Sequence, residues 1–283
     1  MLNPQMKVAC PMIEFRAARR PRTAGSLPEE CPIEGKRIVV TDACSEIGRE
    51  TARLLGLHGA EVILVARNGS QLIRECATII QAGGRAHWYR CDLSALGDVD
   101  QLVEWLLTEF DAVDVLVNNT GRPTRRPVLQ SLDRFRDYQR MMAAYYFGPL
   151  RLTLGLLPAM LAGGSGHVVN VGPWSAETGA APNFASYASA QAAWATFGQC
   201  ADAELSPRGI HVTTVQCPAF ELDTGSPACV PQHPTLDPAE AARWIESAIR
   251  TGPAQLQPRF PRALLGLASM SPRTTRLKHA LGI

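Results

Sequence analysis

The sequence has little charge of either sign in excess, since 28 Lys and Arg residues meet 26 Asp and Glu residues for a formal net charge of +2. Such a balance does not produce the positive field that sequence-independent nucleic-acid binding needs, so nucleic acid is excluded as an expected partner. The chain has 283 residues, of which 46% are hydrophobic and 19% charged. This composition excludes a disordered chain and predicts a globular protein with a sizeable core.

Cysteine pairing motifs are missing as well. The eight cysteines form no C-x-x-C pair, and no histidines stand at zinc spacing from them. We therefore expect reduced thiols, no metal site and a cytoplasmic protein. No apolar stretch of signal-peptide length follows a basic start, which agrees with that location.

A run without Asp, Glu, Lys or Arg, residues 152–176, has the length of a membrane span. Pro158 and the glycine-rich residues 163–166 interrupt it. The run is interpreted as a helix, a turn and a buried strand, so no membrane span is predicted.

The first 34 residues are rich in proline and arginine and show no apolar period. They predict a flexible basic N-terminal arm, residues 1–34. A single domain is expected over 35–258, with a lid at about 218–238 and a tail at 259–283.

Within that domain, short β-rich runs alternate with helical stretches. Continuous apolar strands indicate burial on both faces, and the alternation predicts right-handed crossovers between parallel strands. The fold class expected is therefore α/β, a doubly wound parallel sheet of the Rossmann type. The predicted strands are 37–41, 61–66, 86–91, 113–118, 167–171 and 210–216, and a cap helix is predicted at 238–250.

Three short motifs follow the first, fourth and fifth predicted strands. T-D-A-C-S-E-I-G at 41–48 follows the first strand, N-N-T-G at 118–121 follows the fourth, and Y-A-S-A-Q at 187–191 opens a helix after the fifth. Their order resembles the short-chain dehydrogenase/reductase family over about residues 36–258. Within the family the chain looks most like actinobacterial enzymes, including the reductase domain of fatty acyl-CoA reductases.

The resemblance implies a first turn with three glycines, where the backbone approaches the pyrophosphate of a dinucleotide. Only Gly48 remains here, because Asp42 and Glu46 occupy the other two positions. A carboxylate about 5 Å from a phosphate costs on the order of 3 kcal/mol at an effective dielectric near 20. We therefore expect no cofactor, or NADP if one binds. The dinucleotide contacts implied by the resemblance are Gly48, Arg67, Asp92, Asn118 and Gly121.

The family's catalytic group is Asn, Ser, Tyr and Lys. Tyr187 keeps the tyrosine, but Gln191 stands at the lysine position and Tyr145 at the asparagine position, while the serine position falls on Pro173 or Trp174. Without an ammonium neighbour, a phenol keeps a pKa near 10. Tyr187 is therefore predicted to donate a proton at pH 7 and to be a very poor base.

These changes predict a remodelled, apolar pocket for a hydrophobic small molecule. The candidate catalytic residues are Tyr187, Tyr145, Ser175 and Glu177, with Glu221 as a second choice of carboxylate. The candidate substrate contacts are Trp174, Phe184, Phe220, Gln191 and Arg122. Simple packing by the two phenylalanines, a solvated Glu177 and a solvated arginine rim at 122–126 are alternatives that the sequence leaves open.

Three functions compete on this evidence. The favoured one is a non-redox enzyme of the isomerase, cyclase or dehydratase type, in specialised metabolism, which has lost the usual hydride-transfer machinery. The alternatives are a catalytically silent subunit partnering an active relative, and an atypical NADP-dependent reductase. The charge-poor helices at 133–161 and 187–205 match the pair that forms a four-helix interface in this family. We expect a homodimer or homotetramer, or a hetero-oligomer with an active relative.

Overall fold

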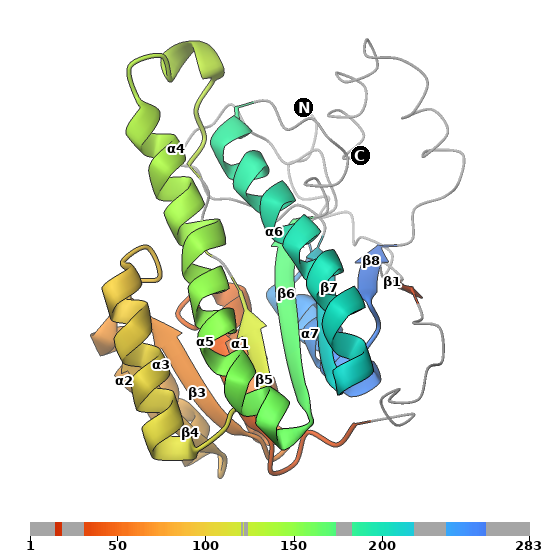
Figure 1. Ribbon diagram of the computed structural model, residues 1–283. Coiled ribbons are helices and arrows are strands. Elements are labelled where there is room, and N and C mark those ends of the chain that lie inside the picture. Colours follow the sequence, from red (N-terminus) through yellow and green to blue (C-terminus); the bar gives the residue numbers. More distant parts are fainter. Residues whose placement is uncertain are drawn as a thin grey trace, which may run out of the picture.

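The computed structural model describes residues 15–18, 31–119, 121, 124–173, 183–217 and 236–258 (Figure 1). Its eight-stranded sheet has the order β1-β8-β7-β6-β5-β2-β3-β4. All neighbours pair in parallel except β1, which runs antiparallel to β8. This confirms the doubly wound parallel sheet. The strands are β1 (Phe15–Ala18), β2 (Arg37–Thr41), β3 (Glu61–Ala66), β4 (Arg85–Arg90), β5 (Val115–Asn118), β6 (Gly166–Pro173), β7 (Ile210–Cys217) and β8 (Gln255–Pro258).

Helices cover both faces of the sheet, as the apolar strands require. One core cluster joins α1, α2 and α7 to one face, and a second joins α3, α5 and α6 to the other (Figure 1). The helices are α1 (Glu46–Leu57), α2 (Gly69–Gln81), α3 (Leu96–Phe110), α4 (Phe135–Met142), α5 (Gly148–Gly163), α6 (Ala185–Leu205) and α7 (Pro238–Thr251). Short 3-10 turns lie at η1 (Val128–Gln130) and η4 (Ser206–Arg208), and a π-helix lies at η2 (Ala143–Phe147).

Capping side chains fix where the first two helices begin. The Ser45 hydroxyl accepts a hydrogen bond from the Gly48 amide at 3.1 Å, and the Asn68 side chain accepts one from the Gln71 amide at 3.1 Å. Each cap satisfies one of the free amides at a helix start. The N-termini of α1 and α2 therefore lie directly beyond the carboxyl ends of β2 and β3.

The π-helix η2 joins α4 to α5 without a break in the ribbon (Figure 1). A π-helix turn holds more residues than an α-helical turn, and such turns occur often at functional sites. Tyr145 lies in the middle of η2 and is buried. The sequence predicts one continuous helix here, so the local widening is a feature that only the structure reveals.

Two four-residue strands were not predicted from the sequence. β1 lies inside the expected arm and pairs with β8, which follows the last predicted helix. Ile33 also belongs to the expected arm, but it is buried in the core cluster that α1, α2 and α7 share. Within the described ranges, no helix is long and apolar enough to cross a membrane.

Candidate functional site

The carboxyl ends of the strands form the site, at the point where the sheet order reverses between β2 and β5. In open α/β sheets ligands bind at this place. An open cavity of ≈ 690 Å³ lies beside it. It is lined by Asp42, Cys44, Ala66, Arg67, Asn68, Gly69, Ser70 and Arg90.

Two arginines give this cavity an anion-binding character. Parallel pairing of β3 with β4 sets Ala66 beside Arg90, so Arg67 and Arg90 both lie at the cavity. The Arg90 Nε donates a hydrogen bond to the Arg67 carbonyl at 3.2 Å. Guanidinium groups and the Ser70 hydroxyl suit the phosphate of a phosphorylated adenosine.

The turn after β2 keeps a glycine-like backbone although its first glycine position holds Asp42. Asp42 has a φ of 46°, in the left-handed region that aspartate tolerates better than most residues. Gly48 is still required, because a Cβ there would lie 2.3 Å from the Asp42 carbonyl oxygen. The tight turn therefore survives a substitution that the sequence suggested would obstruct it.

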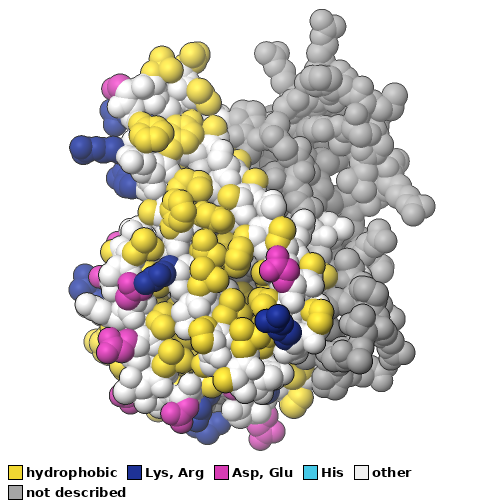
Figure 2. Space-filling view, viewed as in Figure 1, with side chains coloured by type: hydrophobic (Ala, Val, Ile, Leu, Met, Phe, Trp, Pro, Cys, Tyr) yellow, Lys and Arg dark blue, Asp and Glu magenta, His cyan; other side chains and the backbone are white. Residues whose placement is uncertain are grey.

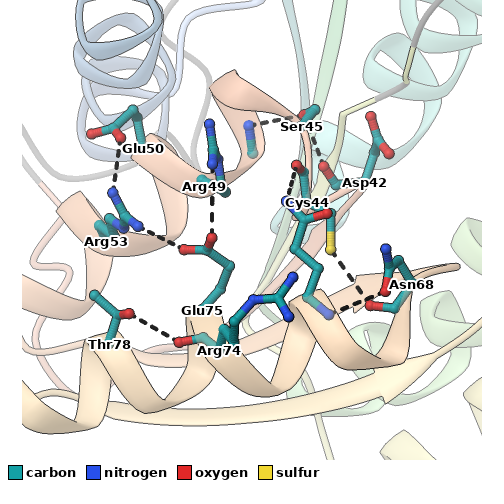
Figure 3. Close-up of polar contacts among 12 residues, drawn as sticks. Asp42, Cys44, Ser45, Arg49, Glu50, Arg53, Asn68, Arg74, Glu75 and Thr78 are labelled. Atoms are coloured by element: carbon teal, nitrogen blue, oxygen red, sulfur yellow. Dashed lines mark hydrogen bonds and ion pairs between the residues drawn. The ribbon is translucent and has the colours of Figure 1, made fainter.

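The Asp42 side chain points away from the first turn of α1 (Figure 3). Its Oδ2 lies 2.9 Å from the place where a Cβ on Gly121 would stand, so the carboxylate packs over Gly121, which lies beyond the end of β5. Figure 3 shows the Asp42 side chain pointing away from the helix that carries Arg49 and Arg53. Glu46 is exposed to solvent at the start of α1, where water and salt screen its charge.

Asn119 holds the turn in place, and sequence reasoning missed it. Its Nδ2 donates to the Ser45 Oγ at 3.0 Å, and its carbonyl accepts from the Thr41 Oγ1 at 2.8 Å. The Ser45 hydroxyl in turn donates to the Asp42 carbonyl at 2.8 Å. The signal for this role was the second asparagine of N-N-T-G, since β5 and β2 end side by side.

Two other predicted dinucleotide contacts, Asn118 and Asp92, make hydrogen bonds within the protein. Asn118 is fully buried, and its Nδ2 donates to the Thr153 Oγ1 at 3.3 Å and to the Asn170 Oδ1 at 3.1 Å. It therefore ties β5 to α5 and β6. The Asp92 carboxylate accepts from the Ser94 amide at 3.0 Å and from its hydroxyl at 2.7 Å, which shapes the loop before α3.

The two predicted tyrosines lie against each other. The rings of Tyr145 on η2 and Tyr187 on α6 meet edge to face, with centroids 5.0 Å apart. Gln191 is one helical turn after Tyr187 and is 2% exposed. Its Nε2 donates a hydrogen bond to the Tyr187 Oη at 3.2 Å. The structure therefore brings together three of the residues predicted from the sequence.

Burial raises the pKa of Tyr187 well above its ordinary value of 10. Among the described residues, the proximity of Tyr145 raises that pKa further, and the hydrogen bond from Gln191 lowers it in part. Burial also raises the pKa of Tyr145, helped by the Asp42 carboxylate and opposed by Arg67. Both phenols therefore carry their protons at neutral pH and act as donors.

The remaining predicted residues divide into two groups. Phe184 is half-buried immediately before α6. Five predicted site residues and the second-choice carboxylate lie outside the described residues: Arg122, Trp174, Ser175, Glu177, Phe220 and Glu221.

Arg126, in the arginine rim at 122–126, makes contacts within the protein. Its Nε lies 2.9 Å from the Asp137 Oδ2, and its backbone amide donates to the Asn183 carbonyl at 2.6 Å. It connects the loop after β5 to α4 and to the start of α6. Across the described part of the chain, no group of three His, Cys, Asp or Glu residues could hold a metal ion.

A family profile described as short chain dehydrogenase matches residues 36–228. The chain belongs to the short-chain dehydrogenase family. It is 38% identical over 242 residues to a fatty acyl-CoA reductase of Mycobacterium tuberculosis, covering 85% of this chain and 82% of that one. It is 34% identical over 251 residues to a fatty acyl-CoA reductase of Acinetobacter baylyi, covering 88% and 85%. A crystal structure of actinorhodin polyketide ketoreductase with NADPH superposes with a TM-score of 0.70 at 26% identity, covering 78% and 94%.

These relatives overturn the expectation of a non-redox enzyme that has lost the hydride-transfer machinery, because they are named as reductases. They agree with the third alternative, the reductase. The expectation failed for a physical reason. It treated Asp42 as an obstruction, whereas this residue adopts the glycine-like conformation and turns its side chain toward Gly121. The expectation that no cofactor binds is likewise unsupported in a family whose solved relative carries NADPH.

The described residues fit a phosphorylated dinucleotide. Arg67, Arg90 and Ser70 at the cavity match the charge of an adenosine phosphate. Gly48 lets the start of α1 pack closely against the backbone of Asp42 and Ala43, which a Cβ would prevent. Two carboxylates oppose this fit, because Asp42 lines the same cavity as the two arginines and Glu46 is exposed at the start of α1.

Proposed function

We propose that this chain is an NADP-dependent reductase that acts on the carbonyl group of a hydrophobic acyl substrate, with Tyr187 as the proton donor. The names of the relatives support the reaction class and a fatty acyl substrate. The observation that carries the proposal is the hydrogen bond from the Gln191 Nε2 to the Tyr187 Oη at 3.2 Å.

The direction of that hydrogen bond matters. Because the amide of Gln191 donates to the phenol oxygen, the hydroxyl hydrogen of Tyr187 remains available for a substrate oxygen. A lysine at this position would favour the phenolate, the form that removes a proton from an alcohol. A neutral amide holds the oxygen in place and leaves the phenol protonated. Reduction needs a donor and oxidation needs a base, so this pair favours reduction.

Two parts of the chain would hold NADP. Arg67 and Arg90 would bind the 2′-phosphate, and the N-terminal turn of α1 at Gly48 would receive the pyrophosphate. When bound, the cofactor supplies a hydride. The protein's own contribution is the proton that the Tyr187 Oη gives to the substrate oxygen, with Gln191 and Tyr145 fixing the ring.

NADPH consumption with a long-chain acyl-CoA and with a long-chain aldehyde tests the proposal. We expect turnover of at least one of them. Tyr187→Phe should slow it by about 10² to 10⁴, the usual contribution of a proton donor, while NADPH fluorescence titration stays unchanged. Tyr146→Phe is the matched control, because it also removes one phenol hydroxyl, on η2, at a ring that contacts Phe147 and Trp194.

Either of two results would contradict the proposal. One is the absence of saturable NADPH binding up to millimolar concentration. The other is a turnover rate that Tyr187→Phe and Tyr146→Phe change equally little.

A further inference from the structure

The segment that leads from β5 into α4 ends in exposed apolar side chains. Leu129 is 83% exposed, Leu132 81% and Phe135 71%, and Val128 is exposed beside them. These four residues are called the apolar tip below. Figure 1 places the start of α4 at an end of the molecule, beyond the sheet, and Figure 2 shows apolar side chains gathered over it with no other described element above them. Clusters of large exposed apolar side chains mark interaction surfaces.

Arginines surround this tip. Residues 124–140 contain five arginines and two aspartates, so the segment is basic while the whole chain is nearly neutral. Arg134, Arg136 and Arg140 are exposed. Asp137 is buried beneath the segment and pairs with Arg126 and Arg140, so its charge is already compensated. The outer surface of the segment therefore combines leucine and phenylalanine side chains with positive charge.

We infer that the apolar tip and its arginines dock on an anionic lipid surface. Interfacial segments of this composition place their apolar side chains at the boundary of headgroups and acyl chains and keep basic groups among the phosphates. A second copy of this chain is a poorer match. A twofold contact through the tip would bring together the five arginines that residues 124–140 of each copy contain, against two aspartates, of which Asp137 is buried and Asp133 is exposed. A layer of anionic headgroups satisfies the apolar and the charged groups at once.

Docking would also orient the site. Phe135 opens α4, and Tyr145 follows ten residues later on the same continuous helical segment, a helical rise of ~15 Å. The lipid surface would then lie at the same end of the molecule as the carboxyl ends of the strands. The docking itself does not depend on the proposed reductase activity.

Vesicle flotation with the full chain, without nucleotide or substrate, tests this inference. Vesicles of phosphatidylcholine alone are compared with vesicles that also contain phosphatidylglycerol. We expect binding to the anionic vesicles, weakening as salt rises. Leu129→Ser combined with Leu132→Ser should weaken it by about tenfold or more. Arg134→Gln combined with Arg136→Gln should remove the preference for anionic vesicles.

The matched control is Leu57→Ser combined with Ile80→Ser. Both side chains are exposed, on α1 and α2. This variant should bind vesicles as the unchanged chain does. Thermal unfolding followed by circular dichroism establishes that all variants are folded, which is expected because every substituted side chain is exposed.

Three outcomes would overturn the inference. The first is no binding to anionic vesicles, and the second is an equal loss in the tip variant and in the control. The third is a tip variant that dissociates an oligomer in light scattering while vesicle binding persists, because the tip would then be a contact between copies.

Discussion

The side-chain amide of Gln191 occupies the position from which a lysine acts on the tyrosine in the family that this chain resembles. It donates to the Tyr187 Oη at 3.2 Å and carries no charge. Burial, the largest influence on Tyr187, raises the pKa of its phenol. A group with a raised pKa keeps its proton until the pH passes that higher value. The donor form of Tyr187 therefore persists through neutral and mildly alkaline solution.

Gln191→Lys should reverse this behaviour. An ammonium beside the phenol lowers its pKa, so the rate of reduction should fall at alkaline pH at which the unchanged protein is still fully active. Profiles of kcat/KM from about pH 6 to 10 measure this alkaline limb. Gln191→Leu is the control, since it removes without adding charge a hydrogen bond that lowers the Tyr187 pKa, so it should lower the rate and move the limb toward higher pH, the opposite direction. If the alkaline limb of the kcat/KM profile lies at the same pH in all three proteins, Gln191 has no influence on the proton transfer.

Parts of the site could be predicted residue by residue. Tyr187 and Gln191 are four positions apart in a helix, so their contact follows from spacing. The left-handed backbone of Asp42 could not be predicted, because the aspartate replaces the glycine that normally signals it. The contact of Asn119 with Ser45 joins residues 74 positions apart and depends on β2 and β5 being neighbours in the sheet.

At the scale of elements, the buried carboxylate of Asp137 connects α4 to the loop after β5 through an ion pair with Arg126. Asp137 is 6% exposed and lies between Arg126 and Arg140, and its neighbour Asp133 faces solvent. Hydrogen bonding from Arg140, followed by that from Arg126, lowers the pKa of Asp137 below its ordinary 3.8. Its ionised form therefore stabilises the fold above about pH 4, and that stabilisation is lost as pH falls through the lower folded-state value.

Asp137→Asn should lower the midpoint of urea unfolding at pH 7. The difference from the unchanged chain should shrink toward pH 3, where the carboxyl group begins to take up its proton. Asp133→Asn should leave the midpoint unchanged at both values, because that side chain is 86% exposed. A difference for Asp137→Asn that does not depend on pH would show that its charge has no part in holding α4.

The six strands β2 to β7 were predictable as elements because each is a β-rich run bounded by turns, although β4 is the edge strand and alternates between exposed and buried residues. β2 and β3 have the predicted bounds, and β4 to β7 differ from prediction by no more than two residues at either end. β1 and β8 are four residues long and mutually dependent, so no local pattern marks them. The π-helix η2 was also not predictable, because residues 143–147 have the composition of an ordinary helix.

At the scale of the whole molecule, the face of α5 and α6 in the foreground of Figure 2 carries few charges and many apolar side chains. Phe147, Leu154 and Leu161 are exposed there, with Leu154 at 50%. These helices belong to the pair that the family resemblance assigns to a four-helix interface. A homodimer or homotetramer through this face remains our prediction.

Leu154→Arg tests that assembly. A charge placed at the centre of an apolar interface should raise the dissociation constant by about thirtyfold or more, as expected for a residue that matters strongly to binding. Light scattering at micromolar concentration should then change from an oligomer to a 30.7 kDa monomer. Leu57→Arg, at an exposed position on α1, should leave the assembly unchanged. A monomer in the unchanged chain would refute the predicted interface.

The pairing of β1 with β8 also concerns solubility. Parallel strands β7 and β8 end the sheet on this side, and β1 occupies the outer edge of β8 over all four residues. An uncovered strand edge offers unpaired amides and carbonyls to the strands of other molecules. A shortened chain beginning at residue 31 should therefore retain its core but aggregate faster in turbidity measurements at raised temperature. The outer edge of β8 is therefore covered by β1, a strand that comes before all the parallel strands in the sequence.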